Sequence, residues 1–379
     1  MDTDVKYKVK SFDCTMIEQF DKLLYDSWNE NHIFLKIPEL KLWQYQGYGK
    51  VSGMAFPVLF DNNLLIGFRG VCPQELRYIQ DGRIVIDTIA IASLFLVRPE
   101  YRGQKLGLLL LQKTLEKYGN FMAIASNLKT SAPIYKKSGY SIMNEMYRYV
   151  VPLSLRYGSI LLDNSVDFTK HILNIHENAI YPVSFTAEQL SSAWNNSIAN
   201  HDIISLNKST DFWSWRFLNH PVYNYLFFGG KGQGGIIVAR VSSLYNDQGN
   251  ELEPKVFRIL EIIPEDTNVW LGNYSSALTG LLSRVLKYAQ EIGCVAAEFY
   301  CTTRLFEPSL INSGMYLVAD NPQLDAASYF EPLSMTVKRL SNVTLALPRY
   351  KGEVDFSKVY LSLSDADQDR PNIMPNKYG

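Results

Sequence analysis

The sequence predicts an α/β protein with two domains, each a twisted mixed sheet flanked by helices. An apolar stretch at 89–97 is followed at once by a glycine-containing loop and an apolar helix. The order helix, strand and short helix then recurs in the second half. A chain of 379 residues, 47% of them hydrophobic, is long enough for two or three cores. The patterns divide it into a first domain (1–153), a connector (154–181), a second domain (182–345) and a C-terminal tail (346–379).

The elements before the loop are predicted as a helix and a hairpin. Residues 16–28 are amphipathic, which indicates a helix. Residues 55–60 and 64–72 flank the turn sequence Asp61-Asn62-Asn63, which predicts two antiparallel strands. After the loop we expect a helix that ends at Tyr118 and a strand at 121–126, and residues 148–153 are predicted as the last strand of the first domain.

The loop at 98–107 has the composition of an anion site. Pro99 ends the strand and a helix opens soon after, so backbone N–H groups without intrahelical partners converge there, and the helix dipole adds positive potential. Arg102 and Lys105 add positive charge, while Gly103 and Gly107 allow backbone to approach a ligand closely. We expect a pyrophosphate as the ligand. The alternative is a surface loop before an ordinary amphipathic helix.

This loop resembles the acyl-CoA-binding motif of the GNAT acyltransferase superfamily. The motif is Arg or Gln, two residues, Gly, one residue, then Gly or Ala. Arg102 and Gly107 match its ends, whereas Lys105 stands where the family usually has Gly. Residues 132–140, with the sequence APIYKKSGY, are similar to the family's LYxKxGF ending. The resemblance implies two tandem GNAT-like domains.

The resemblance also implies that acyl-CoA is the cosubstrate and that its acyl group moves directly from the thioester to a neutral amine. Backbone N–H groups beside 95–97 are expected to hold the acyl carbonyl and the pantetheine arm. The residues expected to bind the cosubstrate are Leu96, Val97, Arg102, Gly103, Gln104, Lys105, Leu106, Gly107, Leu108 and Asn127.

Two catalytic candidates follow from the same resemblance. Tyr135 stands where the family has its general acid toward the leaving thiolate, and a phenol suits that role because the thiolate of CoA is a weak base. The alternative is a packed aromatic that lines the CoA arm. Ser93 and Ser126 are expected on two strands that splay apart, with Ser93 pointing toward the acyl group or into the core.

The second half repeats the first weakly. A helix at 281–289, a strand at 295–300 and a Ser-Gly pair at 313–314 mirror the order of the first half. An internal duplication is the simplest account, and chance similarity is the alternative. In place of the basic loop, residues 264–272 carry Glu265 and Asp266 and no basic residue. We therefore expect the second domain to bind no CoA and to form the wall that receives the acceptor.

Charged and aromatic residues of the second half supply further candidates. Glu298 and Glu261 lie within apolar strands, where an unpaired carboxylate is costly. Glu298 is predicted as a general base, and Glu261 as a substrate-binding residue together with Trp213 and Arg216 of the aromatic-rich segment 211–221. The alternatives are ion pairs of the carboxylates with Arg240 or Arg258, and aromatic packing at a domain boundary. Residues 364–372 are acidic and turn-rich, and the alternative to a specific role is a solvated tail.

Charge, apolar runs and the spacing of cysteines and histidines argue against several classes of protein. The net charge of −1 argues against a nucleic-acid partner. No apolar run reaches the length of a membrane span, and residues 1–4 lack the pattern of a signal peptide. The four cysteines and five histidines are scattered without metal-ligand spacing. We expect no metal and a cytoplasmic location.

The predicted function is an acyl-CoA-dependent N-acyltransferase. The whole chain resembles two-domain GNAT enzymes of bacterial surface-polysaccharide pathways, of the anthrose-pathway type, which acylate amino groups of nucleotide-linked deoxyamino sugars. The 24 Tyr and 6 Trp offer rings that stack on sugar and base faces. One alternative is aminoacyl transfer from aminoacyl-tRNA to cell-wall peptides, which the CoA-like loop and the neutral charge disfavour. Another is a non-catalytic acyl-CoA-binding protein.

Overall fold

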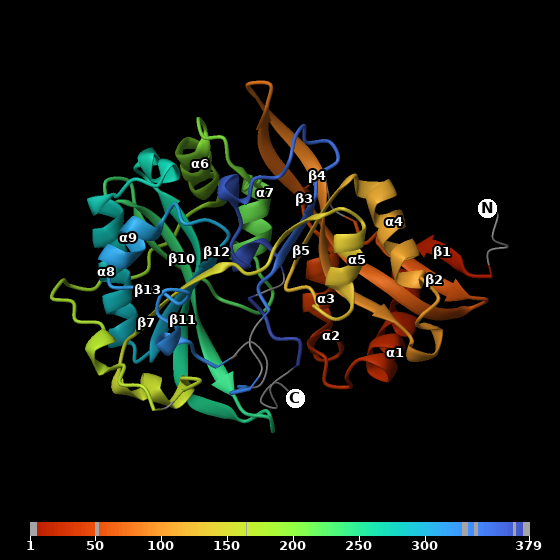
Figure 1. Ribbon diagram of the computed structural model, residues 1–379, viewed down its shortest axis with the longest axis horizontal. Coiled ribbons are helices and arrows are strands. Elements are labelled where there is room, and N and C mark those ends of the chain that lie inside the picture. Colours follow the sequence, from red (N-terminus) through yellow and green to blue (C-terminus); the bar gives the residue numbers. More distant parts are fainter. Residues whose placement is uncertain are drawn as a thin grey trace.

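Two mixed sheets flanked by helices make up the protein, as predicted (Figure 1). The computed structural model describes residues 6–49, 53–163, 165–327, 333–336, 340–366 and 369–373. The first sheet lies on the right in Figure 1 and the second on the left. We call each sheet with its covering helices a half. The largest apolar cluster includes Leu76 and Ile89 of the first sheet and Phe257 and Leu260 of the second, so the halves share a core.

The first sheet has nine strands, and it is mixed because β4 and β5 run parallel while most other pairs are antiparallel. Its main path is β1 (Lys8–Ser11), β2 (Pro57–Asp61), β3 (Leu64–Gln80), β4 (Arg83–Val97), β5 (Asn120–Ile124), β14 (Val343–Ala346) and β6 (Ser141–Met143). Off this path, β8 (Ile204–Leu206) pairs with β3 and with β15 (Val359–Tyr360).

The second sheet has six strands, and it is mixed because β11 and β12 run parallel. Its order is β13 (Tyr316–Leu317), β7 (Tyr147–Pro152), β12 (Ala296–Cys301), β11 (Glu251–Pro264), β10 (Gly235–Tyr245) and β9 (Leu226–Gly230). The helices of the two halves are α1 (Ile17–Ser27), α2 (Ile33–Lys36), α3 (Pro38–Gln46), α4 (Leu106–Tyr118), α5 (Ser131–Lys137), α6 (Ala187–Ile198), α7 (Thr210–Trp213), α8 (Ser276–Glu291) and α9 (Glu307–Asn312).

Local sequence signals explain several of these elements. The predicted helix at 16–28 is α1, and the predicted hairpin is β2 and β3, with Asn62 in the turn at a φ of 52°. Helix α6 begins with a capping box in which Thr186 accepts from the backbone of Gln189 and the Gln189 side chain accepts from Thr186 N. The repeat predicted in the second half appears as α8, β12 and α9.

The halves exchange strands, which the sequence analysis did not predict. The strand predicted to close the first domain is β7, but it pairs with β12 and β13 in the second sheet. In return β14, from the far end of the chain, lies between β5 and β6 of the first sheet. Strand pairing therefore crosses the predicted boundary at residue 153. The expectation that β7 ends the first sheet was wrong, because a strand's sequence does not specify which sheet it joins.

Much of the described part of 363–373 is buried. Ser364, Asp365, Asp369 and Arg370 all lie in the interior, so a solvated tail is not what the structure has there. Figure 1 shows this segment passing between the two sheets. Asp367, Gln368 and residues 374–379 of the predicted tail, and residues 1–4, lie outside the described residues. Among the helices described, none has both the length and the apolar character needed to span a bilayer.

Candidate active site

Strands β4 and β5 separate, as the sequence analysis expected. Their parallel pairing joins Ile89 to Asn120 and ends where Ile91 meets Met122. Beyond that point β4 continues to Val97 paired with β3, and β5 continues paired with β14. Among the described residues, backbone groups of 94–97 on the facing edge of β4 have no strand partner, and they can bind a ligand instead.

A bulge in β4 directs side chains to both faces of the sheet at this opening. Ala92 pairs with Val71 and Phe95 with Arg69, so three steps along β4 match two along β3. In a regular strand Ser93 and Phe95 would share a face. The extra residue places Ser93 toward α3 and Phe95 toward α4, so the bulge serves two different surfaces.

The first surface is a pocket of about 670 Å³ between the end of β4, the loop before α4, and α5. We call it the cationic pocket, because Arg102, Lys105 and Lys137 line it and no carboxylate does. Its other lining residues are apolar or hydroxyl-bearing: Phe95, Leu96, Val97, Tyr101, Gly103, Leu106, Gly107, Leu108, Thr130, Ser131, Ile134 and Ser138. The structure thus brings together most of the residues predicted to bind acyl-CoA.

The amide groups at the mouth of α4 are free to bind an anion. In the described parts of the chain, no acceptor takes the backbone N–H groups of residues 103–108. The N-cap residue Lys105 has a φ of 59° and its side chain does not cap the helix. Arg102 is held over this turn because its Nε donates to Val97 O at 3.0 Å. Free amides, the helix dipole and nearby cations favour a phosphate group here.

Gly107 has a different role from the one predicted. A Cβ on Gly107 would lie 2.8 Å from Cζ of Phe95, so this glycine makes room for a ring of the protein. Gly103, by contrast, has a φ of 81° and open space around it, which suits a loop that must leave its amides exposed. The predicted close approach of ligand therefore applies to Gly103 better than to Gly107.

Two residues predicted to bind the cosubstrate do not line the cationic pocket. Gln104 Oε1 accepts from the hydroxyl of Tyr7 at 2.6 Å. Asn127 Oδ1 accepts from the backbone N of Lys129 at 2.9 Å and of Thr130 at 3.1 Å. These bonds tie the loop to the N-terminal segment and shape the turn before α5, so both residues support the pocket wall.

Tyr135 lies behind this wall, with 1% of its surface exposed. Its hydroxyl accepts from Nη2 of Arg69 at 2.6 Å. Burial raises the pKa of Tyr135, and the charge of Arg69 and the hydroxyl of Ser126 oppose that rise. The phenol therefore keeps its proton at neutral pH. Arg69 was not among the predicted residues, although an arginine within the apolar strand sequence 66–71 is the same kind of signal as Glu298 in its apolar strand.

Ser93 faces the second surface, a narrow pocket between the two halves. We call it the inter-half pocket; it is lined by Trp43, Gln44, Cys72, Gln74, Ile91, Ala92, Ser93, Trp215, His220, Ala366, Asp369 and Arg370. Ser93 Oγ accepts from Gln44 Nε2 at 2.6 Å, and Gln44 Oε1 accepts from Arg370 Nε at 2.9 Å. The C-terminal segment thus reaches the bulge of β4 through one glutamine.

Two tryptophans join the halves beside this pocket. The rings of Trp43 and Trp215 stack with centroids 4.6 Å apart, and each indole N–H donates to the backbone carbonyl of the other residue. His220 lies against Trp43, and burial lowers the pKa of His220 to about 3. Its Nδ1 accepts from the backbone N of Val222 and of Tyr223, so the proton of the neutral ring is on Nε2. His220 can donate to a ligand but has no basic nitrogen free.

Glu298, the predicted general base, is paired within the second sheet. Its Oε1 lies 3.0 Å from Nε of Arg258 and its Oε2 lies 3.2 Å from Nη2 of Arg148. The pair with Arg258 is the alternative that the sequence analysis allowed, and Arg148 was not foreseen. Glu298 lines neither pocket beside β4. Its catalytic role remains a prediction without geometric support.

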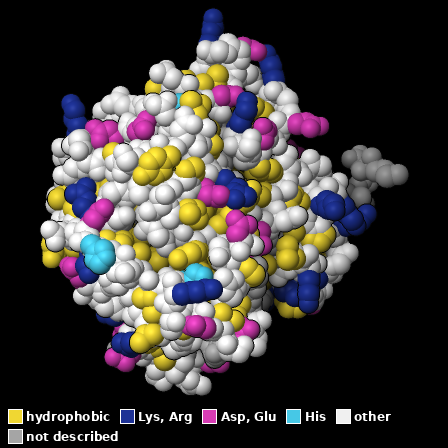
Figure 2. Space-filling view, turned by 60° about the vertical axis from the view of Figure 1, so that its left-hand side comes forward, with side chains coloured by type: hydrophobic (Ala, Val, Ile, Leu, Met, Phe, Trp, Pro, Cys, Tyr) yellow, Lys and Arg dark blue, Asp and Glu magenta, His cyan; other side chains and the backbone are white. Residues whose placement is uncertain are grey.

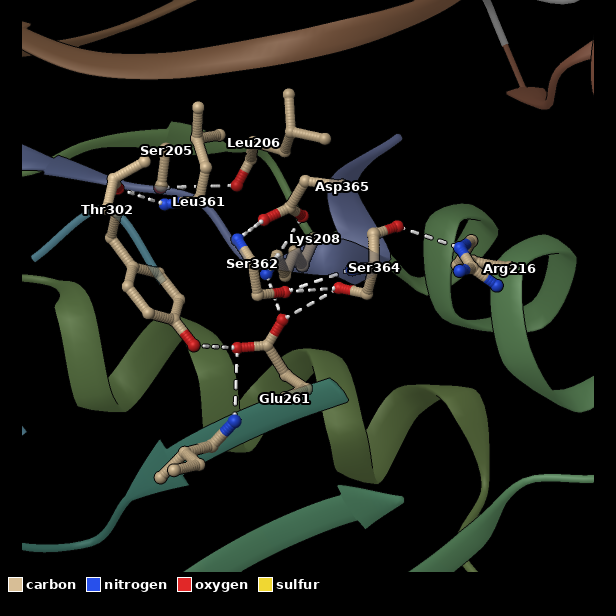
Figure 3. A network of polar contacts seen from close by, with 12 residues as sticks. Ser205, Leu206, Lys208, Arg216, Glu261, Thr302, Leu361, Ser362, Ser364 and Asp365 are labelled. Atoms are coloured by element: carbon tan, nitrogen blue, oxygen red, sulfur yellow. Dashed lines mark hydrogen bonds and ion pairs between the residues drawn. The ribbon is translucent and has the colours of Figure 1, made fainter. Parts of the chain in front are cut away.

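Glu261 lies in a buried network that ties the C-terminal segment to the second sheet (Figure 3). It forms an ion pair with Lys208, which also lies 3.1 Å from Asp365, and it accepts from the hydroxyl of Tyr360 at 2.5 Å. Figure 3 shows Ser364 on the same carboxylate. The alternative partners, Arg240 and Arg258, do not pair with Glu261; Lys208, from the segment after β8, takes their place. No local pattern indicates this pair, because the two residues are far apart in the chain.

Trp213 and Arg216, predicted to contact the acceptor, are buried inside the second half. Arg216 pairs with Asp369 at 2.9 Å and donates to the hydroxyl of Tyr225 at 2.7 Å. The arginine also donates from Nε to Ser364 O. Neither predicted residue lines the inter-half pocket, whereas Trp215 and His220 of the same segment do. A contact with the acceptor would require a rearrangement of this region.

The corresponding loop and helix start in the second half differ from those of the first in their capping and charge. Ser275 caps α8 by accepting from the backbone N of Leu278, and the loop before the helix carries Glu265. The Glu265 carboxylate accepts from the backbone N of Gly232 and of Gly234. A Cβ on Gly234 would lie 2.2 Å from Ala277 O, so the β9–β10 turn packs on the start of α8. That no CoA binds here stays a prediction.

On the face drawn in Figure 2, Lys and Arg side chains are interspersed with Asp and Glu side chains. Within the described ranges, no group of three or more His, Cys, Asp or Glu side chains is arranged to hold a metal ion.

Comparisons with known proteins identify the fold. No family model and no curated protein matches the sequence. The chain is similar to Saccharomyces cerevisiae N-myristoyltransferase with bound myristoyl-CoA, at 11% identity and a TM-score of 0.52 over 91% of this chain and 83% of that chain. A second structure of that enzyme with myristoyl-CoA gives 10% identity and a TM-score of 0.51 over 82% and 76%. A GCN5-related N-acetyltransferase from Anabaena variabilis gives 13% identity and 0.49 over 90% and 72%. At these identities, the likeness to the yeast enzyme shows a common fold.

Proposed function

We propose that this protein is an acyl-CoA-dependent N-acyltransferase. The observation that carries the proposal is the cluster of free amides at residues 103–108, which opens into a pocket with three cations and no carboxylate. The pyrophosphate of CoA would bind at these amides, with Arg102, Lys105 and Lys137 around it. The apolar residues at the end of β4 and on α5 would hold the pantetheine arm, which leads toward the opening beside β4. The fold shared with an enzyme named for myristoyl transfer supports the same cosubstrate class.

In the proposed reaction the two substrates approach β4 from its two faces. The thioester would lie at the bulge, reached by the CoA arm from the cationic pocket and by the amine from the inter-half pocket. The amine nitrogen forms a bond to the acyl carbon while the bond from that carbon to sulfur breaks. Tyr135 lies behind the pocket wall and lines neither pocket, so it would donate its proton to the departing thiolate only where that wall opens, and the nitrogen gives up a proton to water. Unpaired backbone N–H groups at the edge of β4 would stabilise the carbonyl oxygen as it gains charge.

We assign no side chain as the base for the amine. Glu298 is paired with two arginines and lies away from both pockets, while Nδ1 of His220 is occupied by two backbone N–H groups. Ser93 lies at the bulge and holds Gln44, so its role in this proposal is to shape the acceptor side.

The narrower proposal is that the acceptor is the amino group of a nucleotide-linked deoxyamino sugar in the cytoplasm. The stacked Trp43 and Trp215 border the inter-half pocket, and His220 offers a proton to it; rings and a neutral donor suit a sugar or a base. The pocket measures only about 20 Å³, so the two halves would have to move apart to admit either group. We expect acetyl-CoA to be the donor tested first, with myristoyl-CoA as a comparison because the fold resembles an enzyme bound to it.

Two measurements test the proposal. Calorimetry should show acetyl-CoA binding that Arg102→Ala weakens. Release of free CoA thiol should then be measured with acetyl- or myristoyl-CoA as donor and nucleotide-linked amino sugars or amine-bearing peptides as acceptors. Turnover with an amino sugar supports the narrow proposal, and turnover with a peptide amine replaces that acceptor. Binding without turnover of any amine would favour a non-catalytic acyl-CoA-binding protein, and absence of CoA binding would overturn the proposal.

A further inference from the structure

We propose that Arg69 is a positioning residue for acyl transfer, which holds the hydroxyl of Tyr135 and balances the negative charge that forms when this phenol gives its proton to sulfur. The inference rests on the proposed function, and it adds a residue that neither the motif nor the comparisons point to. Its evidence is the environment of one buried guanidinium.

Arg69 lies at the bulge of β4. It is on β3, paired with Phe95, and only 3% of its surface is exposed. Its Cζ lies 4.8 Å from the ring centroid of Phe95, 5.2 Å from that of Phe121 and 5.8 Å from that of Tyr135. These rings come from β4, β5 and α5, the three elements that border the opening between the strands. The guanidinium therefore sits behind Phe95, whose ring lines the cationic pocket.

The charge of Arg69 lacks the compensation that buried charges normally have. In the described residues no carboxylate pairs with it, and its Nε has no acceptor. Guanidinium groups keep their proton in proteins, so the charge cannot be avoided by neutralisation. Arg77 of the same strand, also buried, donates to three backbone carbonyls, and Arg216 pairs with Asp369. An unpaired buried charge is costly, so an anion arriving in the reaction would be stabilised by Arg69.

The hydrogen bond between Arg69 and Tyr135 has the direction that this role needs. Arg69 Nη2 donates, so it occupies a lone pair of the phenol oxygen and does not use the phenol proton. When the carbon–sulfur bond breaks, the phenol proton moves to the thiolate, and a phenolate remains beside Arg69 until solvent returns a proton to it. A buried phenolate without a cation would form poorly, because burial alone favours the neutral phenol.

The test compares CoA with desulfo-CoA, which has hydrogen in place of the thiol. The affinity ratio of the two ligands isolates the contact with sulfur from contacts with phosphates and pantetheine, and it needs no acceptor. We expect wild-type protein to bind CoA more tightly than desulfo-CoA, with a ratio that grows from pH 6.5 to 9 as bound thiol ionises. In Arg69→Met the ratio should fall about tenfold and lose its pH dependence, as expected when a hydrogen bond to a charged group is removed.

Control variants separate this role from a structural one. Arg77→Met removes another buried arginine of β3 and should leave the ratio as in wild type. Arg69→Lys keeps the charge but not the planar fork, so it should retain part of the ratio. If Arg69→Met does not fold, Tyr135→Phe and Arg69→Lys decide, because both must lower the ratio. A ratio unchanged in these variants, or lowered equally by Arg77→Met, overturns the role of Arg69. Failure of wild-type protein to bind either ligand would instead overturn the proposed function.

Discussion

Gly107 lies so close to Phe95 that a single added carbon on the glycine would be 2.8 Å from Cζ of the ring. The ring also lies over Arg69, which in turn contacts Tyr135. A contact in the first turn of α4 is therefore linked through two side chains to the predicted general acid. If CoA binds as proposed, Gly107 would act on it indirectly, by leaving room for the ring of Phe95.

Replacing Gly107 by Ala should weaken acetyl-CoA binding about tenfold or more, because the new Cβ displaces Phe95 into the pocket that it lines. The matched control is Gly280→Ala, in the middle of α8, where an added Cβ meets nothing within 4 Å. That control should leave CoA affinity unchanged and stabilise the protein by about 0.5–1 kcal/mol, as Ala replaces Gly in a helix. Calorimetric titration and thermal unfolding measure the two effects. Equal CoA affinities for both variants would contradict the role of Phe95.

Replacing Arg102 by Ala should lower the affinity for acetyl-CoA about tenfold, since a cation beside the helix N-terminus is lost. The affinity for S-acetylpantetheine, which lacks the phosphates, should not change. The difference between the two ligands locates the pyrophosphate. If both affinities fall by the same factor, Arg102 supports the loop through its bond to Val97 O and does not contact phosphate.

Tyr135→Phe should reduce kcat about 10²-fold with little change in KM, once an acceptor amine is identified. It should also destabilise the protein by about 1–3 kcal/mol, because Nη2 of Arg69 loses the acceptor of its hydrogen bond. Tyr140→Phe is the control: its ring is stacked on Tyr135 with centroids 5.9 Å apart. Steady-state kinetics measures kcat and KM of each variant, and urea unfolding measures its free energy of unfolding. Wild-type turnover in Tyr135→Phe would leave the residue a packing role.

Acid should destabilise the protein partly through His220 and His32, whose pKa values burial lowers to about 3. Both rings are neutral in the folded state, but in the unfolded chain they take up protons below about pH 6.5, so stability falls as the pH drops from there toward 3. At pH 5 each contributes a loss of about 2 kcal/mol. In His220→Asn, whose amide oxygen can accept the same backbone N–H groups, the fall in unfolding free energy between pH 7.5 and 5 should be smaller by about that amount. The unfolding free energies are measured by urea titration at both pH values. If they fall by the same amount in His220→Asn as in wild type, His220 is protonated when folded.

The strand exchange predicts how fragments behave. A fragment ending at Pro152 keeps the cationic pocket's residues but lacks β14, which joins β5 to β6, and exposes β7 without its partners. We expect it to be unfolded or aggregated, as judged by circular dichroism and size-exclusion chromatography, and to bind no CoA. Adding residues 153–379 as a separate chain should restore folding if the halves associate. A folded, monomeric fragment that binds CoA would contradict this account.

Local patterns in the sequence correctly predicted the features that depend on neighbouring residues. The turn at Asn62, the break at Pro99 and the amide-rich start of α4 all depend on residues within a few positions of one another. Most of the expected cosubstrate residues therefore line one pocket. The acceptor side was predicted poorly, because Trp215 and Gln44 meet Ser93 and the C-terminal segment only through tertiary packing.

Buried charges were the hardest features to assign. From sequence alone, a solvated or a catalytic carboxylate could be expected at Glu261, Asp365 and Asp369. The structure instead surrounds these carboxylates with Lys208, Arg216 and hydroxyl groups. Whether a carboxylate in an apolar strand is functional or paired depends on which distant cation the fold brings to it. Neither periodicity nor spacing carries that information.

The position of β14 also sets an order for synthesis of the chain. Asn342, just before β14, bonds to Ser126 across 216 positions, and β14 completes the pairing of β5. The edge of β5 therefore stays open on the ribosome until residue 346 has emerged, which at about 5–20 residues per second takes on the order of ten seconds or more after β5 is made. During that interval the cationic pocket has its loop and helix but an unfinished sheet. A chaperone, or an early contact with the second half, would have its effect on yield in this window.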